Sequence, residues 1–273
     1  MRSAAPLVLE VDLGPGIRAA LTFARRPVDL AAGDGTVGAD EGFNLSLAVG
    51  PTHGTPAHRE LLRQWVGVPI AYARQVHGAH VHVCTAVPTG DEPVADADAL
   101  VTSASGLAVA VLVADCVPVL LADPGAGVVA AVHAGRRGLV AGVVPAAVAA
   151  MVAQGARTAS VKAFVGPSAC GACYEVPAVL RAEVDEAVPG TASTTSWGTP
   201  SLDLAAGVRH QLGAAGVVDV EQMDACTLTD PRWYSHRGAL LDPARGQGRF
   251  AALVRVLPGA RVSPPSRTGT GLA

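Results

Sequence analysis

The hydrophobic pattern of the chain predicts strands in the first half and alternating strands and helices in the second. Two short apolar runs flank the Gly14-Pro15-Gly16 turn, which is typical of a β-hairpin. Strands are expected at residues 7–13, 17–23, 70–73, 81–87, 99–102, 107–114, 117–122, 128–133, 161–165 and 250–256. Helices are expected at residues 56–66, 139–153, 176–188 and 204–215. The order of elements indicates a mixed α and β domain whose sheets are covered by helices.

Two local features refine this pattern. In the helix at 56–66 we expect Leu61, Leu62 and Trp65 to share one face. Residues 135–138 carry two glycines and are expected to form a turn before the next helix.

Residues 106–122 are strongly apolar and nearly long enough to span a bilayer. Asp115 and Pro118 interrupt the run, and Val and Leu alternate with Ala before them, so we interpret it as a buried strand followed by a turn, with residues 117–122 continuing the same buried block. The N-terminal apolar run is cut by Glu10 and Asp12 and is too short for a secretory signal. We therefore expect a cytoplasmic protein that does not enter a membrane.

Composition narrows the class of protein. The chain has 273 residues, of which 50% are hydrophobic and only 4% aromatic, so the core must consist mostly of small branched side chains. A net charge of -3 gives no electrostatic basis for binding nucleic acid.

The polar segment 29–42 is expected to be a loop and residues 258–273 a disordered tail, which leaves a single catalytic domain at 1–257. Five cysteines without an export signal indicate a reducing compartment and metal or catalytic use.

His77, Cys116 and His133 each follow or end an apolar strand, where rigid scaffolds present functional groups. Two imidazoles and one thiolate are good zinc ligands, and three protein ligands leave a fourth position for water or substrate. Spacing alone is also compatible with ordinary core residues.

Two other clusters compete with this triad. His80, His82 and Cys84 fall on one face of a strand, which is more typical of an exposed polar face than of a site. Cys170 and Cys173 form a CxxC pair, but no second pair has the spacing of a structural zinc site. A redox role would require a strand that leads directly into a helix N-terminus.

Arginines beside the triad are candidates for anion binding. Arg136 and Arg137 directly follow His133-Ala134-Gly135, and Arg74 precedes His77 by three residues. Guanidinium groups bind phosphate in a bidentate fashion, although solvated surface arginines would show the same pattern.

Several short segments, taken together in their order, resemble the polyphenol oxidase or laccase-domain family. They are Asn44-Leu45-Ser46, Arg74-Gln75-Val76-His77-Gly78, Asp98-Ala99-Leu100-Val101-Thr102, Ala114-Asp115-Cys116-Val117-Pro118, Val132-His133-Ala134-Gly135, Gly166-Pro167-Ser168, Cys173-Tyr174-Glu175-Val176, Cys226-Thr227 and the Gly-x-Gly-Arg close at 246–249. That family is described as purine nucleoside phosphorylases with adenosine deaminase activity and also as peptidoglycan editing factors. The resemblance implies an α+β fold, a single-domain four-layer α/β/β/α sandwich with mixed sheets, similar to the catalytic domain of cytotoxic necrotising factors. It also implies zinc at His77, Cys116 and His133.

The chain departs from the family pattern at two places. Arg136 stands where the family usually has Trp, and Val49-Gly50-Pro51 stands where a Gly-Asp pair is usual. Arg137 matches the family arginine, and Asn44 belongs to the shared Asn-Leu segment.

The resemblance, together with the His-Cys-His triad, implies a zinc-dependent purine nucleoside enzyme. Phosphorolysis would convert adenosine, inosine or methylthioadenosine to free base and ribose 1-phosphate, and the same site would deaminate adenosine with water activated by zinc. Arg137 would bind phosphate, with Asn44, Arg74 and Arg136 as further substrate-binding candidates, and Asp115 would move the proton beside Cys116. The partners expected are a nucleoside and phosphate, and the expected state is a monomer or a small homo-oligomer.

Three alternatives remain open. The first is a cysteine or zinc hydrolase that edits a peptidoglycan precursor, a UDP-MurNAc-amino acid amidase; in the cysteine hydrolase, Cys116 would be the nucleophile and His133 its base. The chain would be a non-enzymatic protein if a fourth protein ligand closed the zinc site. A true laccase is disfavoured because multicopper sites need roughly ten histidine ligands and the chain has 8 histidines. Cu²⁺ at the same three ligands is nevertheless chemically compatible.

Overall fold

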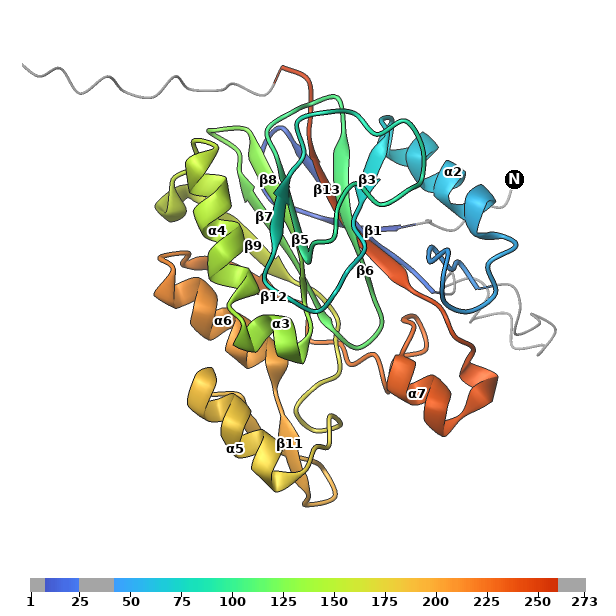
Figure 1. Cartoon of the computed structure of the whole chain (residues 1–273), viewed down its shortest axis with the longest axis vertical. Helices are drawn as coiled ribbons and strands as arrows, with labels where there is room; N and C mark the ends of the chain where they lie inside the picture. The colour runs from blue at the N-terminus through green and yellow to red at the C-terminus, as the bar shows by residue number, and fades with distance from the viewer. Residues whose placement is uncertain (1–7, 25–41, 260–273) are drawn as a thin grey trace, which may run out of the picture.

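Two mixed β-sheets packed face to face form the centre of the molecule in the computed structural model, which describes residues 8–24 and 42–259 (Figure 1). The five-stranded sheet has the order β1 (Val8–Val11), β2 (Ile17–Thr22), β13 (Phe250–Val256), β6 (Ala108–Val113) and β3 (Ile70–Tyr72). The six-stranded sheet has the order β12 (Asp219–Gln222), β9 (Lys162–Val165), β7 (Val117–Asp123), β8 (Val128–Ala134), β5 (Ala99–Thr102) and β4 (Val81–Val83).

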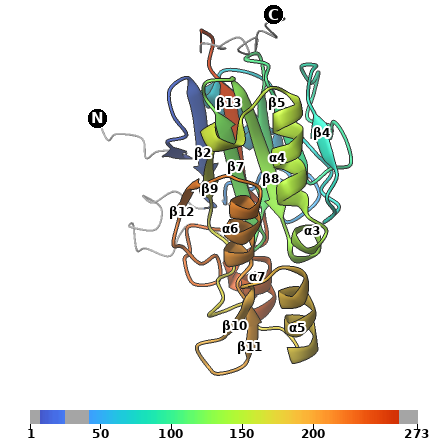
Figure 2. The same cartoon turned by 90° about the vertical axis from the view of Figure 1, so that its left-hand side faces the viewer.

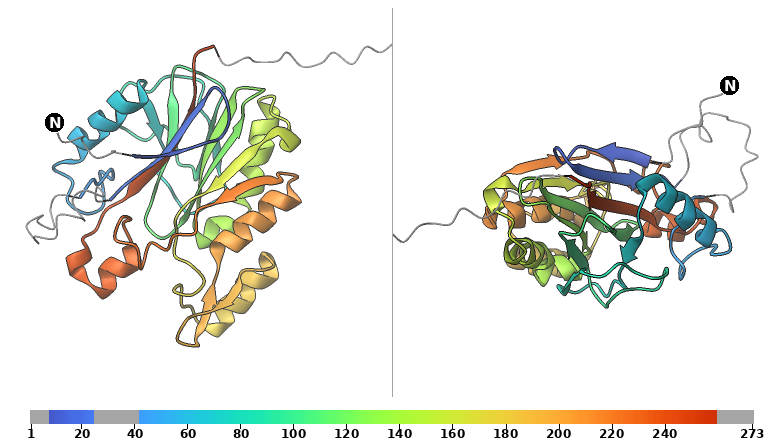
Figure 3. Two further views of the ribbon diagram at one scale, coloured as in Figure 1. Left: turned by 180° about the vertical axis from the view of Figure 1, so that it is seen from behind. Right: turned by 90° about the horizontal axis from the view of Figure 1, so that it is seen from above.

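Helices cover the outer face of each sheet. The bounds are α2 (Thr55–Val66), α3 (Arg136–Val140), α4 (Val143–Ala153), α5 (Ala178–Ala187), α6 (Leu204–Ala214) and α7 (His236–Leu241), with short 3-10 turns at Thr158–Ser160 and Pro243–Arg245. Figure 1 shows α4 and α6 on one side of the strands and α2 on the other. In the view from above in Figure 3, the blue β1–β2 hairpin lies on the side away from α3 and α4. The four-layer α/β/β/α arrangement of a single domain is therefore confirmed.

The cores between the layers are built from small branched residues, as the composition predicts. Leu21, Val111 and Leu120 are fully buried where the two sheets meet. Val132, Val144 and Leu212 are fully buried between the six-stranded sheet and its helices. Each such side chain contributes roughly 1.5–3 kcal/mol through removal of its surface from water. These cores position the ends of strands β3, β7 and β8, where the candidate site lies.

The apolar run at 106–122 forms the two buried strands expected, β6 and β7, but they do not belong to one sheet. β6 belongs to the five-stranded sheet and β7 to the six-stranded sheet. Between them Asp115 adopts φ 81, a left-handed conformation that Asp and Asn tolerate better than most residues. The chain thus crosses from one sheet to the other at Asp115, and Cys116 lies in the seam between the sheets.

The structure corrects three of the predicted elements, namely the helices at 139–153 and 56–66 and the strand at 81–87. The helix expected at 139–153 is divided into α3 and α4 because Gly142 has φ 84, and α3 begins at Arg136, where a turn was expected. The buried face of α2 carries Leu62 and Val66, whereas Leu61 is 48% exposed. The strand expected at 81–87 ends at Val83.

The sequence pattern missed four elements, namely β12, α7 and the antiparallel hairpin β10 (Ala192–Thr194) and β11 (Pro200–Leu202). The hairpin and α5 lie at one end of the molecule (Figure 2). Most of the expected loop at 29–42 and of the expected tail at 258–273 lies outside the described residues, and the domain bounds stay a prediction. Within the described ranges, no helix is both long and apolar enough to cross a membrane.

Candidate active site

The structure brings His77, Cys116 and His133 together, with one ligand atom of each lying within 4.8 Å of the others. His77 follows β3, Cys116 precedes β7, and His133 lies in β8. The Cys116 Sγ is 3.9 Å from Nε2 of His77, and the two imidazole rings meet edge to face with centroids 4.8 Å apart. Two imidazoles and one thiol that converge in this way form a donor set suited to zinc.

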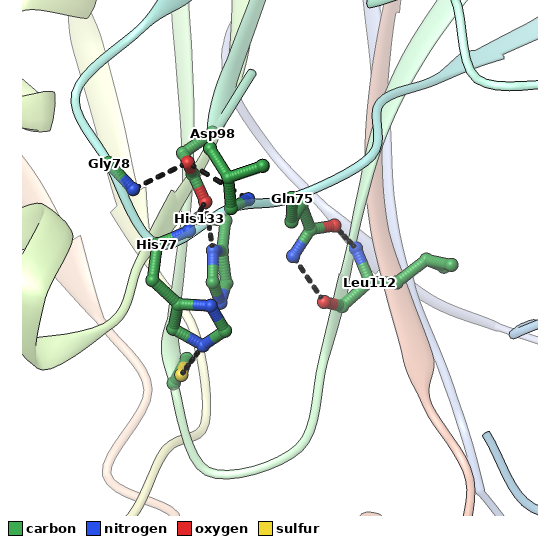
Figure 4. Close-up of polar contacts among 8 residues, drawn as sticks. Gln75, His77, Gly78, Asp98, Leu112 and His133 are labelled. Atoms are coloured by element: carbon green, nitrogen blue, oxygen red, sulfur yellow. Dashed lines mark hydrogen bonds and ion pairs between the residues drawn. The ribbon is translucent and has the colours of Figure 1, made fainter. Parts of the chain in front are cut away.

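Asp98 organises two of the three candidate ligands (Figure 4). Its fully buried carboxylate accepts a hydrogen bond from Nδ1 of His133 at 2.8 Å. The same carboxylate accepts the backbone N–H groups of His77 at 2.9 Å and Gly78 at 2.7 Å. Burial raises the pKa of Asp98, but the hydrogen bonds from His133 and the backbone outweigh it and the pKa is lowered. Because Nδ1 of His133 is committed to Asp98, its Nε2 is the nitrogen available for a metal.

The backbone is shaped to admit these side chains. His77 has φ 60, and this sparsely populated conformation is stabilised by the hydrogen bonds of the 77–78 segment to Asp98. A Cβ at Gly135 would lie 2.8 Å from Cδ2 of His77 and 3.1 Å from Sγ of Cys116. Only glycine therefore fits at Gly135 without displacing the candidate ligands.

Burial and charge act in opposite directions on the thiol. Burial raises the pKa of Cys116, but hydrogen bonds and charge from His133 and His77 outweigh it and bring the pKa to about 6. Burial likewise lowers the pKa of His133, but Asp98 and Cys116 raise it to about 9. Without a metal, the pair is therefore a thiolate beside an imidazolium at neutral pH, and the thiolate is the form of cysteine that binds metals.

A cavity of about 720 Å³ opens onto the three side chains. This volume lies in the range of small-molecule sites, roughly 300–1,000 Å³. Its lining includes Arg136, Arg249 and Asp115. The side chain of Arg136 makes no hydrogen bond or ion pair with any residue that the structure describes, so its guanidinium is available for a ligand.

Asp115 lines the same cavity, and both of its carboxylate oxygens are held. Oδ1 accepts the hydroxyl of Thr227 at 2.6 Å, and Oδ2 accepts the backbone N–H of Arg237 at 2.7 Å. These bonds connect the seam between the sheets to α7 and to the segment that precedes it. The carboxylate is thus fixed beside Cys116.

The other residues expected at the site lie in different surroundings. Arg74 lines the cavity, but its guanidinium is paired with Asp96, with Nε 2.6 Å from Oδ1. Arg137 is exposed and is not part of the cavity lining. The buried Asn44 side chain donates to the carbonyls of Val49 and Pro51 and accepts the N–H of Arg249, so it holds the loop beside the cavity together.

Sequence reasoning gave no role to Asp98, Gly135, Gln75 or Arg249. Each lies in or beside a family segment, and that position was the available signal. Gln75 exchanges two 2.8 Å hydrogen bonds with the backbone of Leu112 and so fastens the His77 loop to β6 (Figure 4). Burial lowers the pKa of Arg249, although Cys116 and Asp115 act in the opposite direction.

The competing cluster at His80, His82 and Cys84 does not converge. Among the described residues, the groups that could hold a metal are the triad and a set of three cysteines. Nδ1 of His80 lies 2.5 Å from the carbonyl of Asp96, and Cys84 is buried in the core between the sheets.

The fold and the site together define the class of protein: a mixed four-layer α/β/β/α domain that carries a His-Cys-His cluster of possible metal ligands where its two sheets meet. Residues 32–257 match the family described as multi-copper polyphenol oxidoreductase laccase, and the chain belongs to this family. It is 53% identical over 218 residues to a protein of Streptomyces coelicolor named purine nucleoside phosphorylase, covering 78% of this chain and 88% of that protein. It is 40% identical over 238 residues to a Mycobacterium tuberculosis protein of the same name, covering 84% of this chain and 91% of that protein.

Solved structures share the fold. YlmD from Geobacillus stearothermophilus matches with a TM-score of 0.79 and 27% identity, over 94% of this chain and 98% of that chain. The Neisseria meningitidis protein NMB0706, of family DUF152, matches with a TM-score of 0.77 and 29% identity, over 92% of this chain and 100% of that chain.

Proposed function

We propose that the chain is a zinc-dependent purine nucleoside phosphorylase that converts adenosine, inosine or methylthioadenosine to free base and ribose 1-phosphate. One observation carries the proposal: the metal-ligand cluster, Arg136 and Arg249 all face the same cavity. The guanidinium of Arg136 has no partner among the described residues, and that of Arg249 donates one hydrogen bond, to the carbonyl of Gly248 at 2.8 Å. The names of the Streptomyces and Mycobacterium relatives support the same reaction. The free thiols of the described chain suit a reducing cytoplasm.

The donor set fits a zinc ion. His77, Cys116 and His133 would hold it, the contact between Asp98 and His133 orients one ligand, and Gly135 leaves room. A bound zinc ion would supply a Lewis acid at the reacting end of the cavity. Imidazole and thiolate also suit copper, so metal analysis of the purified protein decides between Zn²⁺ and Cu²⁺.

The residues of the chain account for phosphate binding and proton movement. In phosphorolysis a phosphate oxygen forms a bond to C1′ while the bond from C1′ to the purine breaks, and positive charge develops on the sugar. Arg136 and Arg249 would hold the phosphate against C1′. Asp115 would move the proton taken up by the departing purine. In adenosine deamination, which we propose as a second activity, Asp115 would move the proton of the attacking water.

The test is metal analysis followed by product analysis with and without inorganic phosphate. We expect about one zinc ion per chain at this site, phosphate-dependent release of adenine and formation of ribose 1-phosphate. Cys116→Ala should abolish both zinc at this site and turnover, whereas the exposed control Arg137→Ala should retain both. Turnover by zinc-free Cys116→Ala protein, or base release without phosphate, would contradict the proposal.

A second candidate is a hydrolase that edits a peptidoglycan precursor, with Cys116 as the nucleophile. The proximity of the Cys116 thiolate to His133 favours it, because a thiol with a pKa of about 6 is ionised at neutral pH. Such an enzyme must work with a free thiolate. Stoichiometric zinc together with protection of Cys116 from an alkylating agent would exclude it.

A further inference from the structure

Three cysteines outside the candidate active site converge in the folded chain. Cys170 and Cys173 lie on the loop after β9, and Cys226 lies on the loop after β12. β9 and β12 are parallel neighbours, with Lys162 opposite Asp219. Both loops therefore begin at the same end of the sheet, where the two strands finish. The three sulfur atoms lie within 4.8 Å of one another, and none is in a disulfide. The fold thus brings a third thiol, that of Cys226, to the CxxC pair.

Backbone hydrogen bonds set the positions of the three sulfurs. The carbonyl of Cys170 accepts the N–H groups of both Cys173 and Tyr174 at 2.9 Å, which closes a tight turn around the CxxC pair. The two loops are joined by a β-bridge between Ser168 and Cys226 and by the N–H of Thr227, which donates to Ser168 at 3.0 Å. The backbone positions of the three cysteines are therefore set by the fold.

The donor set of the cluster favours a bound soft cation. Three thiol groups converge at one point, and each can bind a metal ion as a thiolate. A cation bound among them would offset the repulsion between neighbouring thiolates.

We propose that Cys170, Cys173 and Cys226 bind a second zinc ion, with water as the fourth ligand. Thiolates select soft metal ions, and zinc is the ordinary occupant of sites rich in cysteine. All three residues are half-buried, so water reaches the cluster. A redox CxxC is less well supported because the pair does not begin a helix, since α5 starts at Ala178.

The position of this site gives it a structural role next to the cavity. Cys173 precedes Tyr174, which lines the cavity and stacks under the guanidinium of Arg237 at 4.6 Å. Cys226 precedes Thr227, whose hydroxyl holds Asp115. Zinc between the two loops would fasten one wall of the cavity to the residues that orient Asp115.

The test is zinc per chain in matched cysteine variants purified with a reductant and without a chelator. We expect about two zinc ions in the wild-type protein and in the buried control Cys84→Ser, and about one in Cys226→Ser and in Cys173→Ser. Cys116→Ala should also hold about one, at the cysteine cluster, so this proposal and the proposed function fail independently. Wild-type protein with about one zinc ion that Cys226→Ser retains would overturn the second site.

A second measurement does not depend on the folding of the cysteine-cluster variants. Cys116→Ala protein, in which the cluster is intact, is titrated with Co²⁺ and followed by absorption. Saturable near-ultraviolet bands of thiolate-to-cobalt charge transfer, together with protection of Cys170, Cys173 and Cys226 from alkylation, are expected. Absence of those bands, or a Cys170–Cys173 disulfide found by peptide mapping, would overturn the proposal.

Discussion

Nδ1 of His133 donates a hydrogen bond to Oδ1 of Asp98 at 2.8 Å, and both residues are almost completely buried. The same carboxylate receives the N–H groups of His77 and Gly78. One side chain therefore fixes the ring of one candidate ligand and the backbone of another. Asp98 is a positioning residue, because it reaches the metal site only through His77 and His133.

We predict that Asp98→Asn weakens zinc binding by roughly 10- to 100-fold, the usual effect of losing an outer partner of a ligating histidine. The amide offers one acceptor oxygen where the carboxylate offers two, so the bonds from His133 and from the 77–78 segment cannot all persist. Competition with a fluorescent chelator measures the affinity. Asp96→Asn is the matched control, because Asp96 is an exposed carboxylate that pairs with Arg74. Equal zinc affinity in both variants would show that the Asp98 contact is dispensable.

Gly135→Ala should also reduce metal binding, by steric contact alone. The added Cβ would lie 2.8 Å from Cδ2 of His77 and 3.1 Å from Sγ of Cys116, and ring and sulfur would have to move apart. The control is Gly213→Ala in α6, where a Cβ meets nothing within 4 Å. That change should stabilise the protein by about 0.5–1 kcal/mol. Zinc content and thermal midpoint of the two variants check the prediction, and full zinc occupancy in Gly135→Ala would contradict it.

The strands were predictable because a buried strand requires apolar side chains, and these are visible as a pattern in the sequence. β2, β7, β8 and β13 fall within a residue or two of their expected positions. The assignment of β6 and β7 to different sheets was not predictable from periodicity, because one left-handed residue, Asp115, decides it. β12 and the β10–β11 hairpin were missed because their strands are short and mostly polar or exposed.

The candidate site could be predicted only in part, since convergence is a tertiary property. His77, Cys116 and His133 were suggested by their positions beside strands and by family motifs, but only the fold shows that Asp98 orients the ring of His133 and holds the backbone of His77. Arg136 and Arg137 are adjacent in sequence, and α3 places only the first of them on the cavity wall. Cys226 lies 53 residues after Cys173 in the numbering, and only parallel pairing of β12 with β9 brings it to the CxxC pair.

Alkylation should separate Cys116 from Cys84. In chelator-treated protein the pKa of Cys116 is about 6, so its reactivity should rise as pH passes through 6 and be nearly maximal at pH 7. Burial raises the pKa of Cys84 to about 11, so Cys84 should stay unlabelled there. Peptide mapping after iodoacetamide treatment measures both sites. Zinc should protect Cys116, and a thiol that is labelled equally with and without zinc would contradict its role as a ligand.

Phosphate binding should depend on Arg136 and Arg249 and not on Arg137. Loss of a charge-assisted hydrogen bond costs about 1.5–3 kcal/mol, so each alanine variant should raise the KM for phosphate about 10- to 100-fold. Arg137→Ala should stay within about twofold, because an exposed guanidinium contributes little. Initial rates at varied phosphate and fixed inosine provide the comparison. A larger effect for Arg137→Ala than for the other two variants would show that phosphate binds outside the cavity.

Asp115 can be tested with two substitutions that separate chemistry from backbone conformation. Its φ of 81 is tolerated by Asn, whereas Ala in that region costs roughly 1–2 kcal/mol and also loses the bonds to Thr227 and Arg237. Asp115→Asn should therefore fold with nearly wild-type thermal stability and lose about 10²- to 10⁴-fold in kcat, the usual contribution of a proton-transfer group. Asp115→Ala should lose both kcat and stability. If Asp115 only fastens the seam to α7, Asp115→Asn would keep its kcat while Asp115→Ala still unfolds at a lower temperature, and the proton would have to move through another group.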